Sequence, residues 1–204
     1  MVMLTARWLW TGQDLWEHGA IWIDGGGNVA AIGTESAVRD EVAANTPVEP
    51  LGDALLMPGL VNAHSHAFQR QFRGHVQWQQ AARPGEVARG DFWTWRDAMY
   101  RTANELTPDD VESISRLCFI EMAEAGVTHV GEFHYLHHDR MGARYADPDE
   151  LARRVIAAAC DVGIRITLLR AVYGAGGVDA PLRHDQRRFA TASPEEALAA
   201  VARL

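Results

Sequence analysis

The feature that most constrains this chain is a predominantly apolar run, Leu55–Ala63, that ends in the triplet His64-Ser65-His66. If the run is a strand, residues two apart point to the same face, so His64 and His66 present two imidazoles side by side. They then lie at the strand's carboxyl end, where a β/α barrel has its active site. Two neutral imidazoles directed at one point suit a divalent cation such as zinc. The alternative is a pair of ordinary histidines in a loop.

Alternating helix and strand signals follow this run. Helix starts are indicated at Thr107 and Ser193, where a capping hydroxyl precedes proline and acidic residues. Another start is indicated at Asp147, with Glu150 placed for a capping box. The predicted elements after the histidines are an additional helix near 92–103, a helix over 107–125, a strand over 127–134, a helix over 147–163, a strand over 164–173 and a helix from 193. This alternation predicts right-handed crossovers and a parallel α/β sheet.

The predicted order contains three β/α units, whereas a closed barrel needs eight. A parallel sheet of three strands leaves two edges and one face uncovered. We therefore expect residues 55–204 to form the first part of a TIM-like (β/α)8 barrel that continues in a longer chain. A doubly wound nucleotide-binding sheet is disfavoured, because no phosphate-binding glycine loop follows the first strand.

Residues 1–54 show a different pattern. Segments 2–10, 18–24 and 28–34 are short and rich in Trp, Val and Ile. The glycine-rich segment Asp24–Asn28 separates two of them, as the turn of a hairpin does. We expect a small β-rich sandwich module that precedes the barrel residues.

Charge and composition exclude several classes of partner. The formal net charge of -8 argues against nucleic acid or an anionic membrane, and no apolar run is long enough to span a bilayer. Cys118 and Cys160 lie among apolar neighbours in helix-like segments, so we expect buried thiols and no disulfide. The first residues, from Met1 to Trp10, lack the regions of a signal peptide. A cytoplasmic location is therefore expected.

Four sequence blocks give a more specific indication. They are His64–Arg70, Phe92–Tyr100, Glu132–Asp139 and Asp185–Phe189. In this order, and after a β-rich module, they resemble the formimidoylglutamate deiminase family of the metal-dependent amidohydrolase superfamily. The resemblance implies a hydrolase of carbon–nitrogen bonds that converts N-formimino-L-glutamate and water into N-formyl-L-glutamate and ammonia, in bacterial histidine degradation.

The resemblance also assigns site residues. It implies one zinc ion with His64 and His66 as its first two ligands, and substrate contacts from Gln69, Arg96 and Tyr135. In this family a third histidine ligand, a catalytic histidine and an aspartate come from later barrel strands. No catalytic residue is therefore expected within this chain, and the chain alone is expected to be inactive.

Several of these residues also have a purely structural interpretation. Arg96 can pair with a substrate carboxylate or be a solvated arginine on an aromatic helix. Tyr135 can donate its hydroxyl to a carboxylate or be a packed aromatic at the end of a strand. His134, His137 and His138 form a second cluster, for which hydrogen bonding that orients loops or ligands is the simpler interpretation.

Two further hypotheses stay open. A different amidohydrolase deaminase, of the guanine or triazine type, would share His64 and His66 but would need no arginine for a dicarboxylate. An inactive truncated scaffold would show neither stoichiometric zinc nor turnover. The enzymatic hypotheses require only a small-molecule substrate, and the oligomeric state is left open, a homodimer included.

Overall fold

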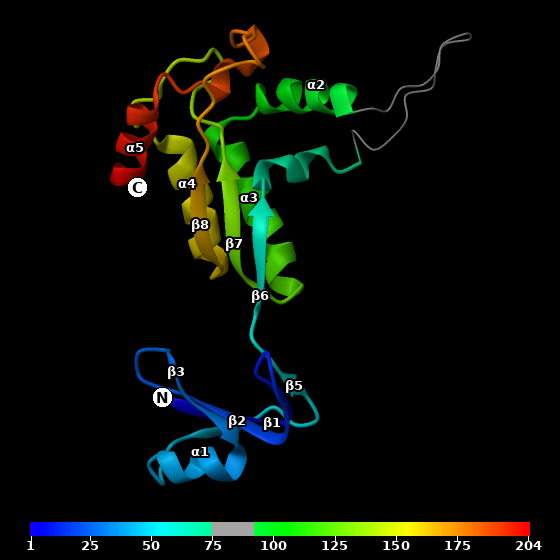
Figure 1. Ribbon diagram of the computed structural model, residues 1–204, viewed down its shortest axis with the longest axis vertical. Helices are drawn as coiled ribbons and strands as arrows, with labels where there is room; N and C mark the ends of the chain where they lie inside the picture. Colours follow the sequence, from blue (N-terminus) through cyan, green and yellow to red (C-terminus); the bar gives the residue numbers. More distant parts are fainter. Residues whose placement is uncertain (75–91) are drawn as a thin grey trace, which may run out of the picture. The chain divides into compact units, whose positions relative to one another are not determined.

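The computed structural model of the chain describes residues 1–74 and 92–204. Two compact units, Met1–Gly59 and Leu60–Leu204, divide the chain. Each unit has its own sheet and its own buried core (Figure 1). Among the described residues, no helix combines the length and the apolar character needed to cross a membrane.

The first unit begins with an antiparallel meander, as its Trp-, Val- and Ile-rich segments predict. Its strands are β1 (Val2–Trp10), β2 (Leu15–Ile23) and β3 (Val29–Thr34). In the turn between β2 and β3, a carboxylate oxygen of Asp24 accepts from the main-chain N–H groups of Gly26 at 2.8 Å and Asn28 at 2.9 Å. Gly27 has a φ of 80°, which glycine adopts without strain. The predicted hairpin is confirmed.

The sequence patterns do not predict three further elements of this unit. They are α1 (Glu35–Glu41), β4 (Val48–Pro50) and β5 (Leu55–Leu56). The sheet order is β3-β2-β1-β4, and β5 also pairs with β1. Val38 of α1 packs in the core of this unit, against Met3 and Ala20 of the sheet. The sandwich organisation of this module stays a prediction, since its described residues form one sheet.

The strand that carries the histidines is shorter than the sequence predicts. Leu55 and Leu56 pair with β1 in the sheet of the first unit, and the strand toward the histidines begins only at Leu60. The physical reason is Pro58, which has no N–H to donate and therefore interrupts the run.

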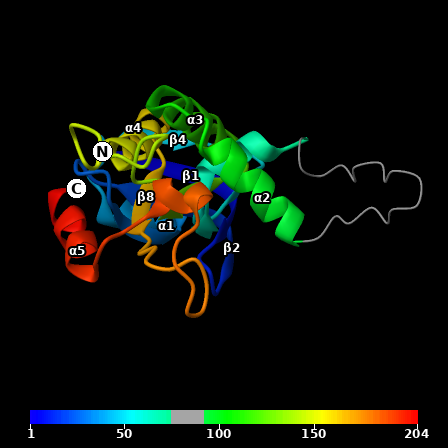
Figure 2. The same ribbon diagram turned by 90° about the horizontal axis from the view of Figure 1, so that it is seen from above.

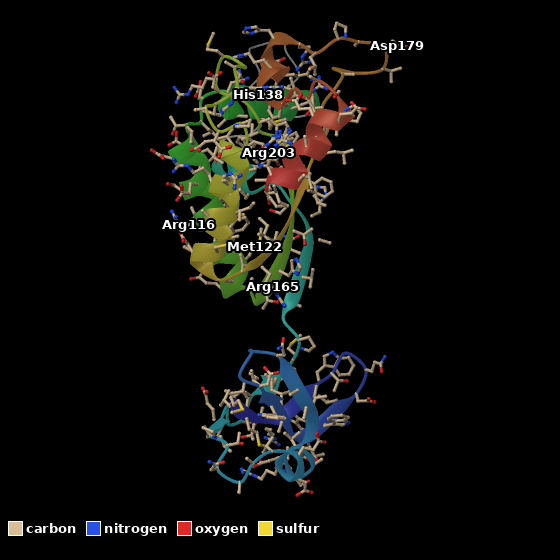
Figure 3. All side chains as sticks on the ribbon, turned by 90° about the vertical axis from the view of Figure 1, so that its left-hand side faces the viewer. Arg116, Met122, His138, Arg165, Asp179 and Arg203 are labelled. Atoms are coloured by element: carbon tan, nitrogen blue, oxygen red, sulfur yellow. The ribbon has the colours of Figure 1, made fainter. Side chains whose placement is uncertain are left out.

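The second unit contains a parallel sheet. Its strands are β6 (Leu60–Ser65), β7 (Val127–His134) and β8 (Arg165–Arg170), in the order β6-β7-β8. Figure 3 shows Arg165 at the start of β8 and His138 beyond the opposite end of the sheet. Both the parallel pairing and the strand order agree with the predicted succession of β/α units.

Helices lie between these strands and after the last one. They are α2 (Phe92–Ala103), α3 (Pro108–Glu124), α4 (Glu150–Val162) and α5 (Pro194–Arg203), with the 3-10 turns η1 (Ala67–Phe72) and η2 (His184–Phe189). α3 and α4 pack side by side against the sheet, and α2 lies beyond the carboxyl ends of the strands (Figures 1 and 2). The main core lies between sheet and helices, where Val130 of β7 packs with Phe119 of α3 and Leu151 of α4.

The amino-terminal cap of α3 has the predicted form. The hydroxyl of Thr107 accepts from the N–H of Asp110 at 3.1 Å, and the Asp110 carboxylate accepts from the N–H of Thr107 at 2.8 Å. Two of the unpaired N–H groups at this helix end are thereby satisfied. The helix ends before Gly126, which has a φ of 83°.

The capping box predicted for α4 is wrong. The residue at the N-cap is Asp149, and its side chain makes no capping hydrogen bond. Its buried carboxylate instead accepts from Nε of Arg203 at 2.7 Å and lies 3.6 Å from Nη1 of Arg170. The two arginines place full positive charges beside this carboxylate, which a single main-chain N–H would not supply.

Two other local predictions differ from the structure. The strand expected over 164–173 is shorter, because β8 includes only Arg165–Arg170. Cys118 and Cys160 are both free thiols, as expected, but Cys160 is exposed and Cys118 is only half-buried. An apolar neighbourhood in the sequence does not determine which side of an amphipathic helix a residue occupies.

Candidate metal and substrate site

The two histidines of the triplet lie together at the carboxyl end of β6. Their Nε2 atoms are 3.1 Å apart, and their ring centroids are 4.8 Å apart. Ser65 between them points to the opposite side and is buried. The structure therefore brings together the pair that the sequence singled out, through the alternation of side chains along a strand.

A main-chain carbonyl group determines which nitrogen of His66 carries the proton. Nδ1 of His66 lies 3.0 Å from the carbonyl oxygen of Phe133 in β7. Because a carbonyl oxygen can only accept, Nδ1 donates and Nε2 keeps its lone pair. Burial lowers the pKa of His66, and this favours the neutral ring. His66 thus presents a neutral Nε2 toward His64.

His64 is more exposed than His66 and is oriented by packing. Its ring centroid lies 4.4 Å from that of Phe133. Its main-chain N–H donates to the side-chain oxygen of Asn62 at 3.1 Å. The main chain of Phe133 therefore acts on His66, whereas its side chain packs against both rings, with centroid distances of 4.4 Å to His64 and 5.8 Å to His66.

The spacing of the two Nε2 atoms fits a zinc ion. Tetrahedral zinc holds nitrogen ligands at about 2.0–2.1 Å, which puts two of them about 3.3 Å apart. The separation of 3.1 Å between His64 and His66 is close to this value. In the described ranges, 1–74 and 92–204, no three or more His, Cys, Asp or Glu side chains are grouped to hold a metal. The described residues therefore offer two nitrogen ligands here.

Gln69 and Tyr135 are in direct contact beside this pair. Nε2 of Gln69, in η1, donates to the hydroxyl of Tyr135 at 2.6 Å. The ring centroid of Tyr135, which follows β7, lies 4.9 Å from that of His66. η1 is itself attached to α3 by a bidentate ion pair between Arg70 and Glu121, with distances of 2.6 and 2.7 Å. Two of the predicted substrate contacts thus adjoin the histidine pair.

Arg96 belongs to a neighbouring aromatic cluster. It is half-buried in α2, and its Cζ atom lies 5.9 Å from the ring centroid of Tyr100, one turn further along the helix. The ring of Phe189 contacts both Tyr100 and Tyr135, each with a centroid distance of 5.3 Å. Phe189 thus connects the cluster of Arg96 with that of Tyr135.

Glu132 is a buried carboxyl group under the turn that carries His66. It is 2% exposed, and its Oε1 accepts from the main-chain N–H of Ala67 at 2.7 Å. Burial raises its pKa to about 7. Glu132 shares its face of β7 with Val130 and His134, which are also buried. Glu132 is thus a buried acceptor that holds the turn after His66.

The second histidine cluster is bonded to the main chain. Nε2 of His137 donates to the carbonyl oxygen of Ala171 at 3.0 Å, and Nε2 of His138 donates to that of Ala190 at 2.9 Å. Burial lowers the pKa of His137 to about 3 and that of His134 well below its usual range. These contacts connect the segment after β7 with the segments that follow β8, as the hydrogen-bonding interpretation expects.

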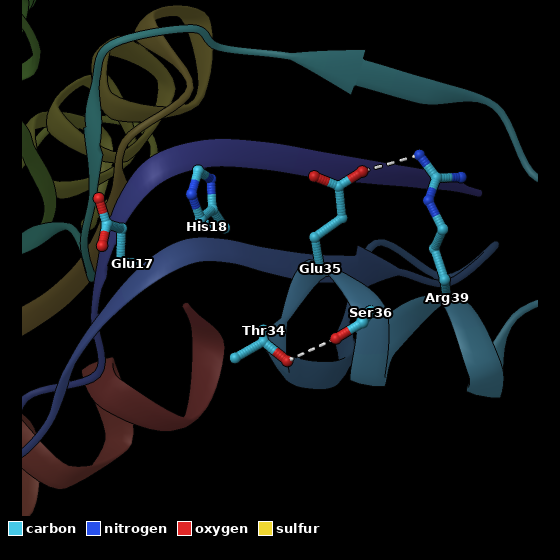
Figure 4. A pocket seen from close by; sticks show the side chains of 6 residues that line it. All are labelled: Glu17, His18, Thr34, Glu35, Ser36 and Arg39. Atoms are coloured by element: carbon cyan, nitrogen blue, oxygen red, sulfur yellow. Dashed lines mark hydrogen bonds and ion pairs between the residues drawn. The ribbon is translucent and has the colours of Figure 1, made fainter.

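A separate hollow of about 520 Å³ lies in the first unit (Figure 4). Its lining residues are Glu17, His18, Thr34, Glu35, Ser36 and Arg39. Glu35 pairs with Arg39 at 2.9 Å, and the hydroxyls of Thr34 and Ser36 lie 3.2 Å apart. None of the residues assigned to zinc or substrate lines this hollow.

Comparisons with known proteins agree on one family. Residues 55–202 match the model of the Amidohydrolase family. The formimidoylglutamate deiminase of Pseudomonas aeruginosa is 43% identical over 166 residues, which are 81% of this chain and 35% of that protein. A crystal structure of an amidohydrolase from Brucella melitensis has 35% identity and a TM-score of 0.80, and the alignment covers 99% of this chain and 42% of the other.

A more distant structure shows the same fold. The zinc complex of the atrazine chlorohydrolase TrzN from Arthrobacter aurescens has a TM-score of 0.74 at 20% identity, over 98% of this chain and 41% of the other. The chain thus spans 35% of the length of the curated relative above and 41–42% of the two solved structures. The expectation of a β-rich module followed by the first β/α units of a TIM-like barrel is confirmed by the near-complete match to the Brucella structure.

Proposed function

Because this chain belongs to the amidohydrolase family, whose members use a metal ion, we propose that its gene product is a zinc-dependent hydrolase of N-formimino-L-glutamate. The reaction adds water to the formimino carbon and releases N-formyl-L-glutamate and ammonia. The observation that carries the proposal is the pair His64 and His66, with Nε2 atoms 3.1 Å apart, next to Gln69 and Tyr135. The 43% identity with a formimidoylglutamate deiminase supports the choice of substrate.

His64 and His66 would hold one zinc ion through their Nε2 atoms. When bound, zinc lowers the pKa of a coordinated water to about 7 and so supplies a nucleophile at neutral pH. His66 is suited to this role because the carbonyl of Phe133 fixes its proton on Nδ1. Burial of His66 also disfavours the protonated ring, which cannot bind a metal.

Gln69, Tyr135 and Arg96 would bind the substrate. The Tyr135 hydroxyl accepts from Gln69 and therefore keeps its own proton for donation to a carboxylate. Burial raises the pKa of Tyr135, so the hydroxyl stays protonated at neutral pH. The guanidinium of Arg96 can form a bidentate ion pair with a carboxylate of the glutamate moiety.

The partner required by this function is a small molecule. The net charge of -8 disfavours nucleic acid and anionic membranes as partners. We propose a cytoplasmic location, in which Cys118 and Cys160 persist as thiols. A homodimer stays a prediction.

The test is ammonia release by the purified natural gene product that carries residues 1–204. We expect turnover of N-formimino-L-glutamate and none of guanine, together with about one zinc ion per chain by elemental analysis. His66→Ala is expected to lose both zinc and activity, whereas the control His184→Ala, at an exposed position, retains both. A preference for guanine, or unchanged zinc content in His66→Ala, would contradict this function.

A further inference from the structure

Two tyrosines from different elements meet beside Arg96. The hydroxyls of Tyr100, in α2, and Tyr173, which follows β8, lie 2.5 Å apart. Nε2 of the buried Gln186 donates to both hydroxyl oxygens, at 3.1 and 3.3 Å. The amide orientation is fixed, because Oε1 of Gln186 accepts from the N–H of Arg183 at 2.9 Å. Three segments distant in sequence thus hold two hydroxyls in one place.

The hydrogen bonds of this group leave one hydroxyl proton available. One tyrosine donates to the other, and the second hydroxyl keeps a proton for which no acceptor is found within residues 1–74 and 92–204. Tyr100 is 2% exposed, whereas Tyr173 is only partly buried. Either hydroxyl can donate in the bond between them. With Tyr100 as the donor, the available proton lies on Tyr173, the more exposed of the two, where a small molecule can reach it. Burial raises the pKa of Tyr173 to about 12, so its hydroxyl stays protonated at neutral pH.

Two guanidinium groups lie beside this hydroxyl pair. The Cζ atoms of Arg96 and Arg183 lie 5.9 and 5.3 Å from the ring centroid of Tyr100. Arg183 is paired with Asp185 at 2.8 Å and lies 3.4 Å from Asp97. A hydroxyl donor close to a guanidinium is a combination that binds a carboxylate, since both groups donate to its oxygens.

A row of rings connects this pair with the histidines. Phe189 lies 5.6 Å from Tyr173 and 5.3 Å from Tyr135, measured between ring centroids. Tyr135 in turn lies 4.9 Å from His66. The hydroxyl pair is therefore part of the same wall of the second unit as the candidate substrate contacts.

We propose that the hydroxyl of Tyr173 is a further substrate-binding group, which donates a hydrogen bond to one carboxylate of the dicarboxylate substrate beside Arg96. Tyr100 and Gln186 are positioning residues that hold the oxygen of Tyr173 in place. The inference rests on the proposed function, because it requires a substrate with two carboxylates. A hydrogen bond to a charged group is worth about 1.5–3 kcal/mol, which is a change of about 10- to 100-fold in binding.

The test compares Tyr173→Phe with the unchanged natural gene product. We expect KM for N-formimino-L-glutamate to rise at least 10-fold with kcat changed less than twofold, since the contacts from Tyr173 to His66 run through the rings of Phe189 and Tyr135. Calorimetry with the product, N-formyl-L-glutamate, gives a readout without turnover, and Kd should rise by the same factor. Tyr145→Phe is the matched control, because the hydroxyl that it removes bonds, among the described residues, only to Arg188, at 3.5 Å. It should leave KM unchanged.

Two substrate analogues separate a direct contact from a structural effect. N-formimino-L-glutamine lacks the side-chain carboxylate, and N-formimino-4-aminobutyrate lacks the α-carboxylate. A direct contact predicts that the effect of Tyr173→Phe disappears with one analogue and persists with the other. An equal effect with both, or no effect with the substrate itself, would overturn the role of Tyr173. If the unchanged protein neither turns over the substrate nor binds the product, the proposed function fails, and the inference fails with it.

Discussion

The substitution Glu132→Gln should change the way in which stability depends on pH. Glu132 is 2% exposed and has a pKa of about 7, raised by burial from 4.5. A carboxyl group with a raised pKa favours the folded state while it is protonated, and this contribution is lost as the pH rises through 7. Glutamine keeps an acceptor oxygen for the N–H of Ala67 but carries no charge at any pH. The variant should therefore not show this loss.

The magnitude follows from the two pKa values. A rise from 4.5 to about 7 corresponds to about 3 kcal/mol when the carboxyl is fully ionised. Between pH 5 and pH 8, most of this amount is lost, which is about 2.5 kcal/mol. Burying the glutamine amide also changes the free energy of unfolding, by an amount that does not depend on pH. This change shifts the plot of stability against pH as a whole and leaves its slope unaffected.

Urea unfolding at pH 5, 6, 7 and 8, with a chelator present, provides the measurement. The free energy of unfolding of the unchanged protein, relative to Glu132→Gln, should fall by about 2.5 kcal/mol from pH 5 to pH 8. Contributions from the buried histidines cancel in this difference. Glu124→Gln, at an exposed position of α3, is the control and should run parallel to the unchanged protein. If the Glu132→Gln curve is also parallel, then the carboxyl titrates in its ordinary range and the reasoning is refuted.

Three further predictions concern stability alone. Arg188 is fully buried and donates to three main-chain carbonyl oxygens. Arg188→Met should therefore lower the free energy of unfolding, measured with urea, by about 3–5 kcal/mol. A decrease no larger than that of the exposed Arg101→Met would contradict this prediction. Thr107→Ala removes the cap of α3 and should cost about 1 kcal/mol, and an unchanged melting temperature would contradict this. A Cβ at Gly131 would lie 2.9 Å from the carbonyl oxygen of Ala63, so Gly131→Ala should lower the free energy of unfolding by about 1–3 kcal/mol. The control is Gly174→Ala, which has open space around the new Cβ and should lower it by less than about 1 kcal/mol.

Local signals predicted much of the second unit. The cap at Thr107 and the glycine at 126 marked the ends of α3, because both act through contacts with the adjacent main chain. The strand Val127–His134 was predicted with the bounds that the structure has. The His-x-His spacing likewise predicted that the two rings would meet, since strand alternation is itself a local property.

Contacts between distant segments account for what was missed. β5 forms because Leu55 and Leu56 find a partner in β1, and no local pattern specifies that partner. Asp149 turns from its helix end toward Arg203, which lies far along the chain. The meeting of Tyr100 with Tyr173 likewise depends on how α2 and β8 pack. The local indication was limited to the position of Tyr100 and Gln186 in two of the four resembling blocks.

The acceptor that fixes the ring of His66 belongs to the peptide backbone of residue 133. Every amino acid has a main-chain carbonyl, so the position of this acceptor depends on the pairing of the strands and not on which residue occupies position 133. A comparison of side chains therefore does not reveal it. A mutational scan of position 133 should accordingly alter the packing of His64 while the protonation pattern of His66 persists. An insertion or deletion that shifts β7 by one residue would have the opposite outcome. The side chains of the site would all be retained, but Nδ1 of His66 would lose its hydrogen bond to the carbonyl oxygen.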